Sequence, residues 1–278
     1  MPLEDEFSDI IKKARTGQQR SVADVARASS LPELELTELE RGQAPRGREQ
    51  VQAVARALGL REEPLAQVAQ GWVPHALPPS MAHVETVQGS IGGYEVKGYV
   101  VHDRGEAILI DTAYNPAAML DLLARRNLRL RAICLTHGHS DHAEGIERIL
   151  KAGAVPVYLG PDDLDLLSWC PAQDIQTVPR DGGTLQVGGL TVRFVTTPGH
   201  TPGGVCYRVE QAAAPICFVG DTLFAGSIGR SNPAGLYQTH LESVRGRVLT
   251  LPADTLLFPG HGPATTVREE LLYNPFAA

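Results

Sequence analysis

A short segment dense in metal-binding side chains constrains this chain more than any other feature. It reads T-H-G-H-S-D-H over residues 136–142, follows the apolar run R-A-I-C-L, and precedes a helical pattern that begins near Glu144. The segment is therefore expected at the C-terminal end of a buried strand, where the small residues Gly138 and Ser140 allow a tight turn. Imidazoles and a carboxylate that converge in this way suit Zn, Fe or Mn.

Three further turns of the same kind follow apolar strands later in the chain. The runs V-R-F-V-T-T-P-G-H-T-P-G, I-C-F-V-G-D-T-L-F and T-L-L-F-P-G-H-G-P place His200, Asp221 and His261 beyond a strand, next to small residues. With the first segment, these turns supply five His and two Asp. This set is large enough to hold two metal ions that share a bridging carboxylate.

From residue 81 the sequence alternates between apolar, β-branched runs and stretches with helical periodicity. We expect strands at Tyr99–His102, Ala107–Asp111, Ala132–Thr136, Val155–Leu159, Leu190–Thr196, Val205–Val209, Pro215–Val219 and Thr255–Phe258. We expect helices at Asn115–Arg126, Glu144–Lys151 and Leu236–Leu249. Strands interleaved with helices predict an α/β layered domain over residues 81–278.

Residues 1–72 have a different pattern, without strand-like runs. Their apolar residues recur at helical spacing, as in Val51, Val54 and Leu58, and Gly59 follows as a stop signal. Four or five short helices are expected, forming a small all-α domain that folds alone. The proline-rich residues 73–80 then predict a linker.

Composition limits the remaining classes of function. The formal net charge of −7 disfavours a general nucleic-acid binder. Neither an 18-residue apolar run nor an apolar signal-peptide core is present, so we expect no membrane partner. Four cysteines without C-x-x-C spacing predict reduced thiols in a cytoplasmic protein: Cys134, Cys170, Cys206 and Cys217.

The four strand-end motifs, in this order and spacing, resemble those of the metallo-β-lactamase superfamily over residues 81–278. This resemblance implies an αββα sandwich with the metals at one edge. It assigns His137, His139 and His200 to the first metal, Asp141, His142 and His261 to the second, and Asp221 to a bridging position. Asp111 matches an early strand-end Asp that orients ligands, and the alternative is an Asp that only initiates a turn.

Within this superfamily, the motifs G-D-T-L-F-A-G-S-I-G-R, P-G-H-G-P-A-T-T and N-P-F resemble glyoxalase II, in particular its short bacterial form. Asp221 occupies the position where true β-lactamases have Cys. Arg230 replaces the Lys of the family's substrate loop, whose aromatic residue is absent here. The resemblance implies two divalent ions, with Zn expected first and Fe or Mn as alternatives.

The expected reaction is hydrolysis of a hydroxyacyl thioester by a hydroxide that bridges the metals. Asp141 would accept the proton of the nucleophile, and Arg230 would bind an anionic part of the substrate, unless it is only a surface residue. A thiolate has a pKa near 8.5 in water and departs without a strong general acid. The alternatives are a persulfide dioxygenase, a lactonase, or a DNA-binding regulator whose hydrolase-like domain senses a metabolite.

The N-terminal domain resembles the helix-turn-helix of phage repressors over about residues 5–65, through S-V-A-D-V-A-R and L-E-R-G. The recognition helix is expected at about Pro32–Glu40, where it carries Glu33, Glu35, Glu38 and Glu40. These carboxylates have the wrong sign for DNA phosphates, although Arg41, Arg46 and Arg48 lie nearby. We therefore expect no tight DNA binding, and we expect this domain to support a homodimer.

Overall fold

The computed structural model describes residues 2–75, 82–168, 176–212 and 214–277. Its described strands form two six-stranded sheets. The first sheet contains, in order, β1 (Val84–Ile91), β2 (Tyr94–Asp103), β3 (Glu106–Ile110), β4 (Arg129–Cys134), β5 (Val157–Tyr158) and β6 (Gln176–Thr177). The second contains β12 (Thr265–Thr266), β11 (Leu256–Pro259), β10 (Ile216–Gly220), β9 (Val205–Glu210), β8 (Leu190–Thr196) and β7 (Thr184–Val187).

The two sheets pack face to face around an apolar core. The central strand β3 shows how the sequence specifies this arrangement, because its side chains alternate between the faces of the sheet. Ile108 and Ile110 pack toward the second sheet, against residues that include Phe218. Ala107 and Leu109 belong to the cluster on the opposite face. Both faces are covered, which explains why this strand is a continuous apolar run.

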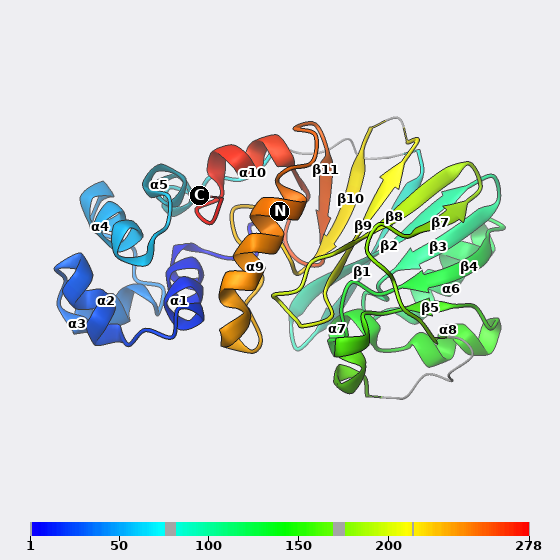
Figure 1. The fold of residues 1–278 in the computed structure, drawn as a ribbon, viewed down its shortest axis with the longest axis horizontal. Coiled ribbons are helices and arrows are strands. Elements are labelled where there is room, and N and C mark those ends of the chain that lie inside the picture. Colours follow the sequence, from blue (N-terminus) through cyan, green and yellow to red (C-terminus); the bar gives the residue numbers. More distant parts are fainter. Residues whose placement is uncertain (1, 76–81, 169–175, 213, 278) are drawn as a thin grey trace.

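Helices form the outer layers of the sandwich (Figure 1). The cluster on the outer face of the first sheet includes Met119 of α6 (Pro116–Arg125) and Ile149 of α8 (Ile146–Ala152). Outside the second sheet lie α9 (Tyr237–Ser243), the π-helical turn η3 (Val244–Val248) and α10 (Val267–Tyr273). The remaining short elements are α7 (Ser140–Ala143), η1 (Pro161–Leu166) and η2 (Ala234–Leu236). The expected αββα sandwich is confirmed.

Two expected elements differ from the structure. The sequence predicts a strand only over residues 99–102, whereas the structure has a long hairpin of β1 and β2. Gly92 and Gly93, both with positive φ, form its two-residue turn. A Gly-Gly pair between two strands is the usual signal for such a turn, so the hairpin was predictable. The helix expected over residues 236–249 is divided between α9 and η3.

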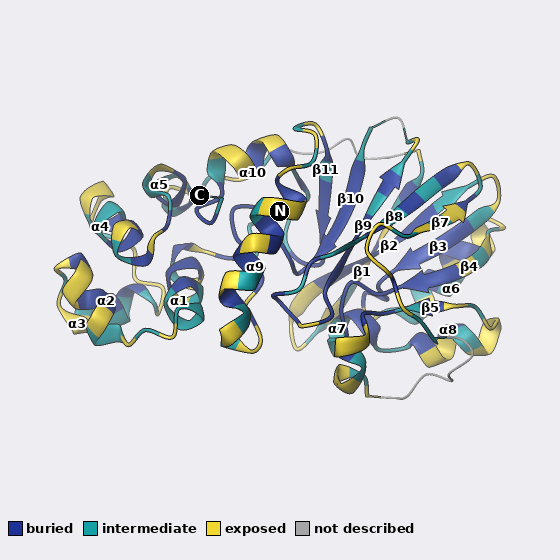
Figure 2. Cartoon of the chain, viewed as in Figure 1, coloured by how far each residue is buried: buried dark blue, intermediate teal, exposed yellow. Residues whose placement is uncertain are grey.

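Residues 2–72 form a small helical unit, which we call the helical module. It comprises α1 (Phe7–Gly17), α2 (Val22–Ser29), α3 (Glu33–Leu39), α4 (Arg48–Leu58) and α5 (Glu62–Ala69). The module does not have a separate core. Ile10 and Leu65 belong to the same buried cluster as Cys217 of β10, Leu241 of α9 and Phe276. In Figure 2, α1 and α9 both carry segments coloured as buried, and in that view the two helices lie next to each other. We therefore expect the module to unfold together with the sandwich rather than alone.

Helix α3 and its C-cap residue Glu40 correspond to the expected recognition helix, and two of the four carboxylates of this segment are used inside the module. Glu40 accepts hydrogen bonds from the Arg15 guanidinium at 2.6 and 2.7 Å, and Glu35 lies 3.4 Å from Arg46. Glu33 is exposed. The acidic face offered to a partner is therefore smaller than the sequence suggests, and DNA binding and dimerisation through the module remain predictions.

No helix in the described ranges is long and apolar enough to cross a bilayer. Three cysteines, Cys134, Cys206 and Cys217, are buried free thiols. Cys170 and residues 76–80 of the expected linker lie outside the described residues.

Candidate metal centre

The candidate metal ligands all lie just beyond strand ends, at one edge of the sandwich. Strands β3 and β4 run parallel, as do β10 and β11, so the C-terminal ends of each pair share an edge. The structure brings all seven predicted ligands together there, in three groups whose ligand atoms lie within 4.8 Å of one another. These groups are His137, His139 and His200, then His137, Asp141 and His142, and finally His142, Asp221 and His261.

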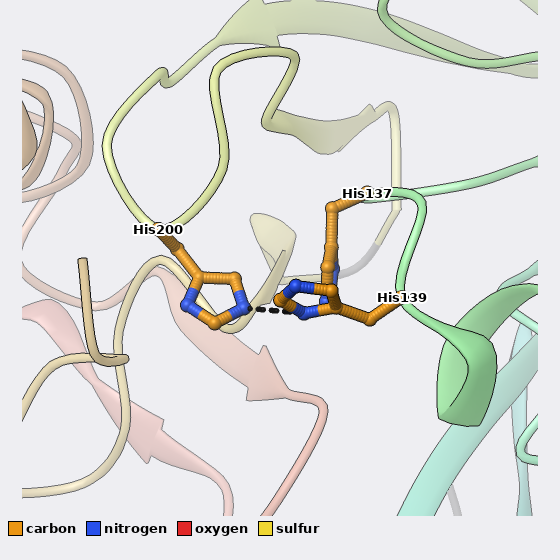
Figure 3. A group of neighbouring side chains, drawn as sticks. All are labelled: His137, His139 and His200. Carbon is orange, nitrogen blue, oxygen red and sulfur yellow. Dashed lines mark hydrogen bonds between the residues drawn. The ribbon is translucent and has the colours of Figure 1, made fainter. Parts of the chain in front are cut away.

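In the first group, three imidazole rings converge on one point (Figure 3). His200 Nδ1 donates to the Arg230 carbonyl at 2.8 Å, which leaves Nε2 with a lone pair 3.0 Å from His139 Nδ1. His137 Nδ1 lies 3.0 Å from Thr136 Oγ1, which donates its own proton to Asp111. His137 Nε2 is consequently an acceptor, and it is buried without a hydrogen-bond partner.

The second and third groups share His142 and together contain both carboxylates, Asp141 and Asp221, and from here on we treat them jointly as the second group. His142 Nδ1 lies 2.8 Å from Asp111 Oδ2, and its Nε2 points to Asp221 Oδ1 at 3.3 Å. His261 Nδ1 donates to the Glu95 carbonyl at 2.6 Å, and its Nε2 lies 3.1 Å from Asp141 Oδ2. Asp221 Oδ2 lies 3.5 Å from His200 Nε2 and 3.7 Å from His261 Nε2, so Asp221 lies between the two groups.

The electrostatics of the two groups differ. Burial lowers the pKa of His137 well below its ordinary value and that of His200 to about 3, so both rings are neutral and offer lone pairs. For His142, burial opposes the charged form, but Asp221 and Asp111 outweigh it and raise the pKa well above the ordinary value. Burial also opposes ionisation of Asp221, yet His261 and His142 hold its pKa well below the usual range. The second group therefore favours positive charge between its carboxylates.

These residues fit two divalent metal ions. Two buried acceptors, His137 Nε2 and Asp221 Oδ1, have no hydrogen-bond partner among the described residues. Such orphaned atoms are rare in proteins, and a cation would satisfy both. Close packing also keeps the surrounding turns small: a Cβ on Gly260 would lie 2.3 Å from His142 Cε1 and 2.6 Å from Asp221 Oδ1.

Comparison with known proteins agrees with this fold and site. The family model described as "Metallo-beta-lactamase superfamily" matches residues 91–261. The chain belongs to this superfamily. The match begins beyond the helical module and leaves the module's resemblance to helix-turn-helix proteins untested.

Relatives of this chain within the superfamily differ in their described activities. It is 29% identical to the hydroxyacylglutathione hydrolase GloC of Haemophilus influenzae over 190 residues, which cover 63% of this chain and 88% of GloC. It resembles the BLEG-1 B3 metallo-beta-lactamase with 31% identity and a TM-score of 0.60, covering 70% of this chain and all of the other. It is also similar to the structure described as TTHA1623 in a di-iron-bound form, with 30% sequence identity and a TM-score of 0.58. This match covers 74% of this chain and all of the other.

The candidate site also contains a buried residue, Asp163, that the sequence analysis does not identify. Asp163 Oδ2 accepts from Gly138 N at 3.0 Å and from Thr201 Oγ1 at 2.7 Å, and Oδ1 accepts from Gly203 N at 2.7 Å. Asp163 thus ties the turn of His137 to the loop of His200. It lies in the run P-D-D-L-D-L, which gives no sign of which acid turns inward.

The two residues predicted to support the site lie at different depths. Asp111 is 1% exposed and accepts from the Thr136 amide at 2.7 Å as well as approaching His142. This buried position fits the predicted role of orienting a ligand, here His142, better than the alternative role of only initiating a turn. Arg230 is exposed, and its backbone carbonyl holds His200. Substrate binding by its guanidinium remains a prediction.

Proposed function

We propose that this chain hydrolyses thioesters at a centre of two divalent metal ions, with Zn expected first and Fe as the main alternative. The observation that carries the proposal is the convergence of five His and two Asp, among which His137 Nε2 and Asp221 Oδ1 are buried acceptors without a hydrogen bond from any described residue. In this assignment His137, His139 and His200 would hold one ion, Asp141, His142 and His261 would hold the other, and Asp221 would be shared by both. The di-iron form of a 30% identical structure supports Fe as the alternative.

When bound, two such ions would lower the pKa of a water molecule toward neutrality and polarise a carbonyl group. Asp141, whose side chain is partly exposed beside His261, would take the proton of the attacking water. Asp111 would keep His142 in the orientation and tautomer that direct Nε2 into the site. Arg230 would bind an anionic part of the substrate from the exposed rim.

The choice of a thioester rests on the leaving group and on the relatives. A thiolate has a pKa near 8.5 in water and departs without a strong general acid. The relative described as a hydroxyacylglutathione hydrolase aligns over most of its own length. The carboxylate of Asp221 at the bridging position distinguishes the site from that of Cys-containing β-lactamases.

The test combines metal analysis with a substrate panel. We expect close to two transition-metal ions per chain, and turnover of a hydroxyacyl thioester that falls at least a thousandfold in D141A or H139A. Substitution of the exposed Glu33 by Gln is the matched control and should leave turnover unchanged. The panel includes a lactone, a persulfide and a β-lactam. One ion per chain after supplementation, with persulfide oxidation, would refute the proposal, as would turnover of a lactone or a β-lactam alone.

A further inference from the structure

The loop that follows Asp221 folds back onto the candidate metal ligands. This loop, residues 222–230, ends at Arg230, whose carbonyl accepts from His200 Nδ1 at 2.8 Å. A Cβ on Gly229 would clash with the Asp221 carbonyl oxygen and would lie 2.8 Å from His200 Nδ1. The backbone of the 222–230 loop therefore lies directly against ligands of both predicted metal groups, and a shift of this loop would disturb them.

Two residues of the helical module hold the middle of this loop. Asp5, which is buried before α1, accepts from Ser227 Oγ and from Lys13 Nζ, each at 2.5 Å. Lys13 Nζ also donates to the Ile228 carbonyl at 3.0 Å. That carbonyl belongs to the same peptide unit as the Gly229 amide. The Asp5–Lys13 pair thus joins α1 to the part of the loop that lies against the ligands.

The Lys13 ammonium also approaches the second metal group through an aromatic ring. It lies 4.9 Å from the ring centre of Phe224, and that ring lies 5.9 Å from the ring of His261. From the sandwich, Glu270 of α10 accepts from Gly226 N at 3.0 Å. The 222–230 loop is consequently held both by α1 of the helical module and by α10 of the sandwich.

The helical module reaches this edge of the sandwich at a further point. A Cβ on Gly262 would lie 2.9 Å from Glu4 N, so the main chain before Asp5 passes against the residue that follows His261. The match to the superfamily begins at residue 91. These contacts are therefore made by a part of the chain that precedes the matched region.

We propose that Asp5 and Lys13 are positioning residues of the metal centre. They hold the 222–230 loop so that its backbone keeps the neighbouring ligands directed into the site. A neutral His200 ring has one proton, and the Arg230 carbonyl keeps that proton on Nδ1. When the loop moves away, this acceptor is lost and the proton is free to move to Nε2, the atom that would bind metal. The inference rests on the ligand assignment in the proposed function.

Two double variants separate this role from the stability of the helical module. D5N/K13M removes both charges of the pair, so no buried carboxylate is left without its partner. R15M/E40Q is the matched control, because the Arg15–Glu40 pair joins α1 to the C-cap of α3 inside the module. The side chains of the two pairs are similarly buried, with exposed fractions of 17% and 7% for Lys13 and Asp5 and 14% and 8% for Arg15 and Glu40.

The deciding measurement is the tautomer of His200 in the metal-free full chain at pH 7. It is read from the nitrogen-15 chemical shifts of the imidazole, which are assigned with the variant H200Q. We expect the proton on Nδ1 in the original chain and in R15M/E40Q, and a measurable fraction on Nε2 in D5N/K13M. In titrations with Zn against a chelator, D5N/K13M should bind at least one ion about tenfold more weakly, whereas R15M/E40Q should not.

The outcomes distinguish this inference from the proposed function. An unchanged His200 tautomer in D5N/K13M overturns the inference, as does an equal change in R15M/E40Q. If D5N/K13M does not fold, S227A, which removes only the hydroxyl bond from the loop to Asp5, decides by the same criterion. A tautomer change confined to D5N/K13M, in a chain that binds no metal, supports the positioning role and refutes the proposed function.

Discussion

Replacing Asp111 by Asn tests how far the centre depends on a residue that holds no metal itself. The carboxylate accepts three hydrogen bonds, from the Thr136 amide at 2.7 Å, from Thr136 Oγ1 at 2.8 Å, and from His142 Nδ1 at 2.8 Å. Asn has one acceptor oxygen. If that oxygen keeps the Thr136 amide, the new NH2 group faces His142 Nδ1, and two donors meet.

The conflict is relieved when the His142 proton moves from Nδ1 to Nε2, the atom that is directed into the second metal group. A ligand in the wrong tautomer should weaken binding of the second ion about 10–100-fold. That loss corresponds to about 1.4–2.7 kcal/mol of binding free energy. The metal-free D111N protein should also lose about 2–4 kcal/mol of stability, because bonds to a buried charged acceptor are lost.

Metal content after dialysis against graded chelator buffers measures the first effect, and urea denaturation measures the second. D163N is the matched control, since Asp163 is equally buried and also accepts three hydrogen bonds, none from an imidazole. It should lose stability but keep its affinity for the second ion. A D111N protein that binds the second ion as tightly as the original chain would refute the tautomer argument.

Three further predictions concern the buried carboxyl group of Glu270, the core shared by the module and the sandwich, and the acidic helix α3. Burial raises the pKa of Glu270 to about 7. The folded protein therefore loses stability as the pH rises from about 4.5 through 7, because the buried carboxyl group ionises less readily than it does in the unfolded chain. E270Q should therefore be more stable than the original chain by about 2 kcal/mol at pH 8 and no more stable at pH 5, as thermal melts will show. Because the helical module shares its core with the sandwich, circular dichroism and tryptophan fluorescence should report one unfolding transition, and two separated transitions would contradict this. The acidic α3 predicts DNA binding weaker than about micromolar at physiological salt, and selection of a nanomolar site from random DNA would contradict it.

The convergence of the candidate ligands could be predicted from the sequence because their segments follow apolar runs and contain small residues. Strand ends meet at a sheet edge, so local patterns were enough to place His137, His200, Asp221 and His261 together. Asp163 could not be found in this way, since its importance comes from donors in two loops distant in sequence. The alternation of apolar strands and helices predicted an α/β layered domain, and the resemblance to the metallo-β-lactamase superfamily implied the sandwich.

The position of the helical module could not be predicted. An amphipathic helix shows which face is buried but not what buries it, and the apolar face of α1 would suit a separate core equally well. The contact between Glu4 and Gly262 depends on two loops that are far apart in the chain. The sequence consequently suggested two domains joined by a linker, whereas the module and the sandwich share one buried cluster.

That shared cluster has a consequence during synthesis. Ile10 and Leu65 emerge early from the ribosome, but Cys217, Leu241 and Phe276, which complete their packing, follow much later. At translation rates of about 5–20 residues per second, the module waits roughly 10–40 s for its partners. During that interval its apolar faces are exposed to chaperones and to neighbouring nascent chains. The helices of the module, which are made before the sandwich, are therefore among the last to be fully folded.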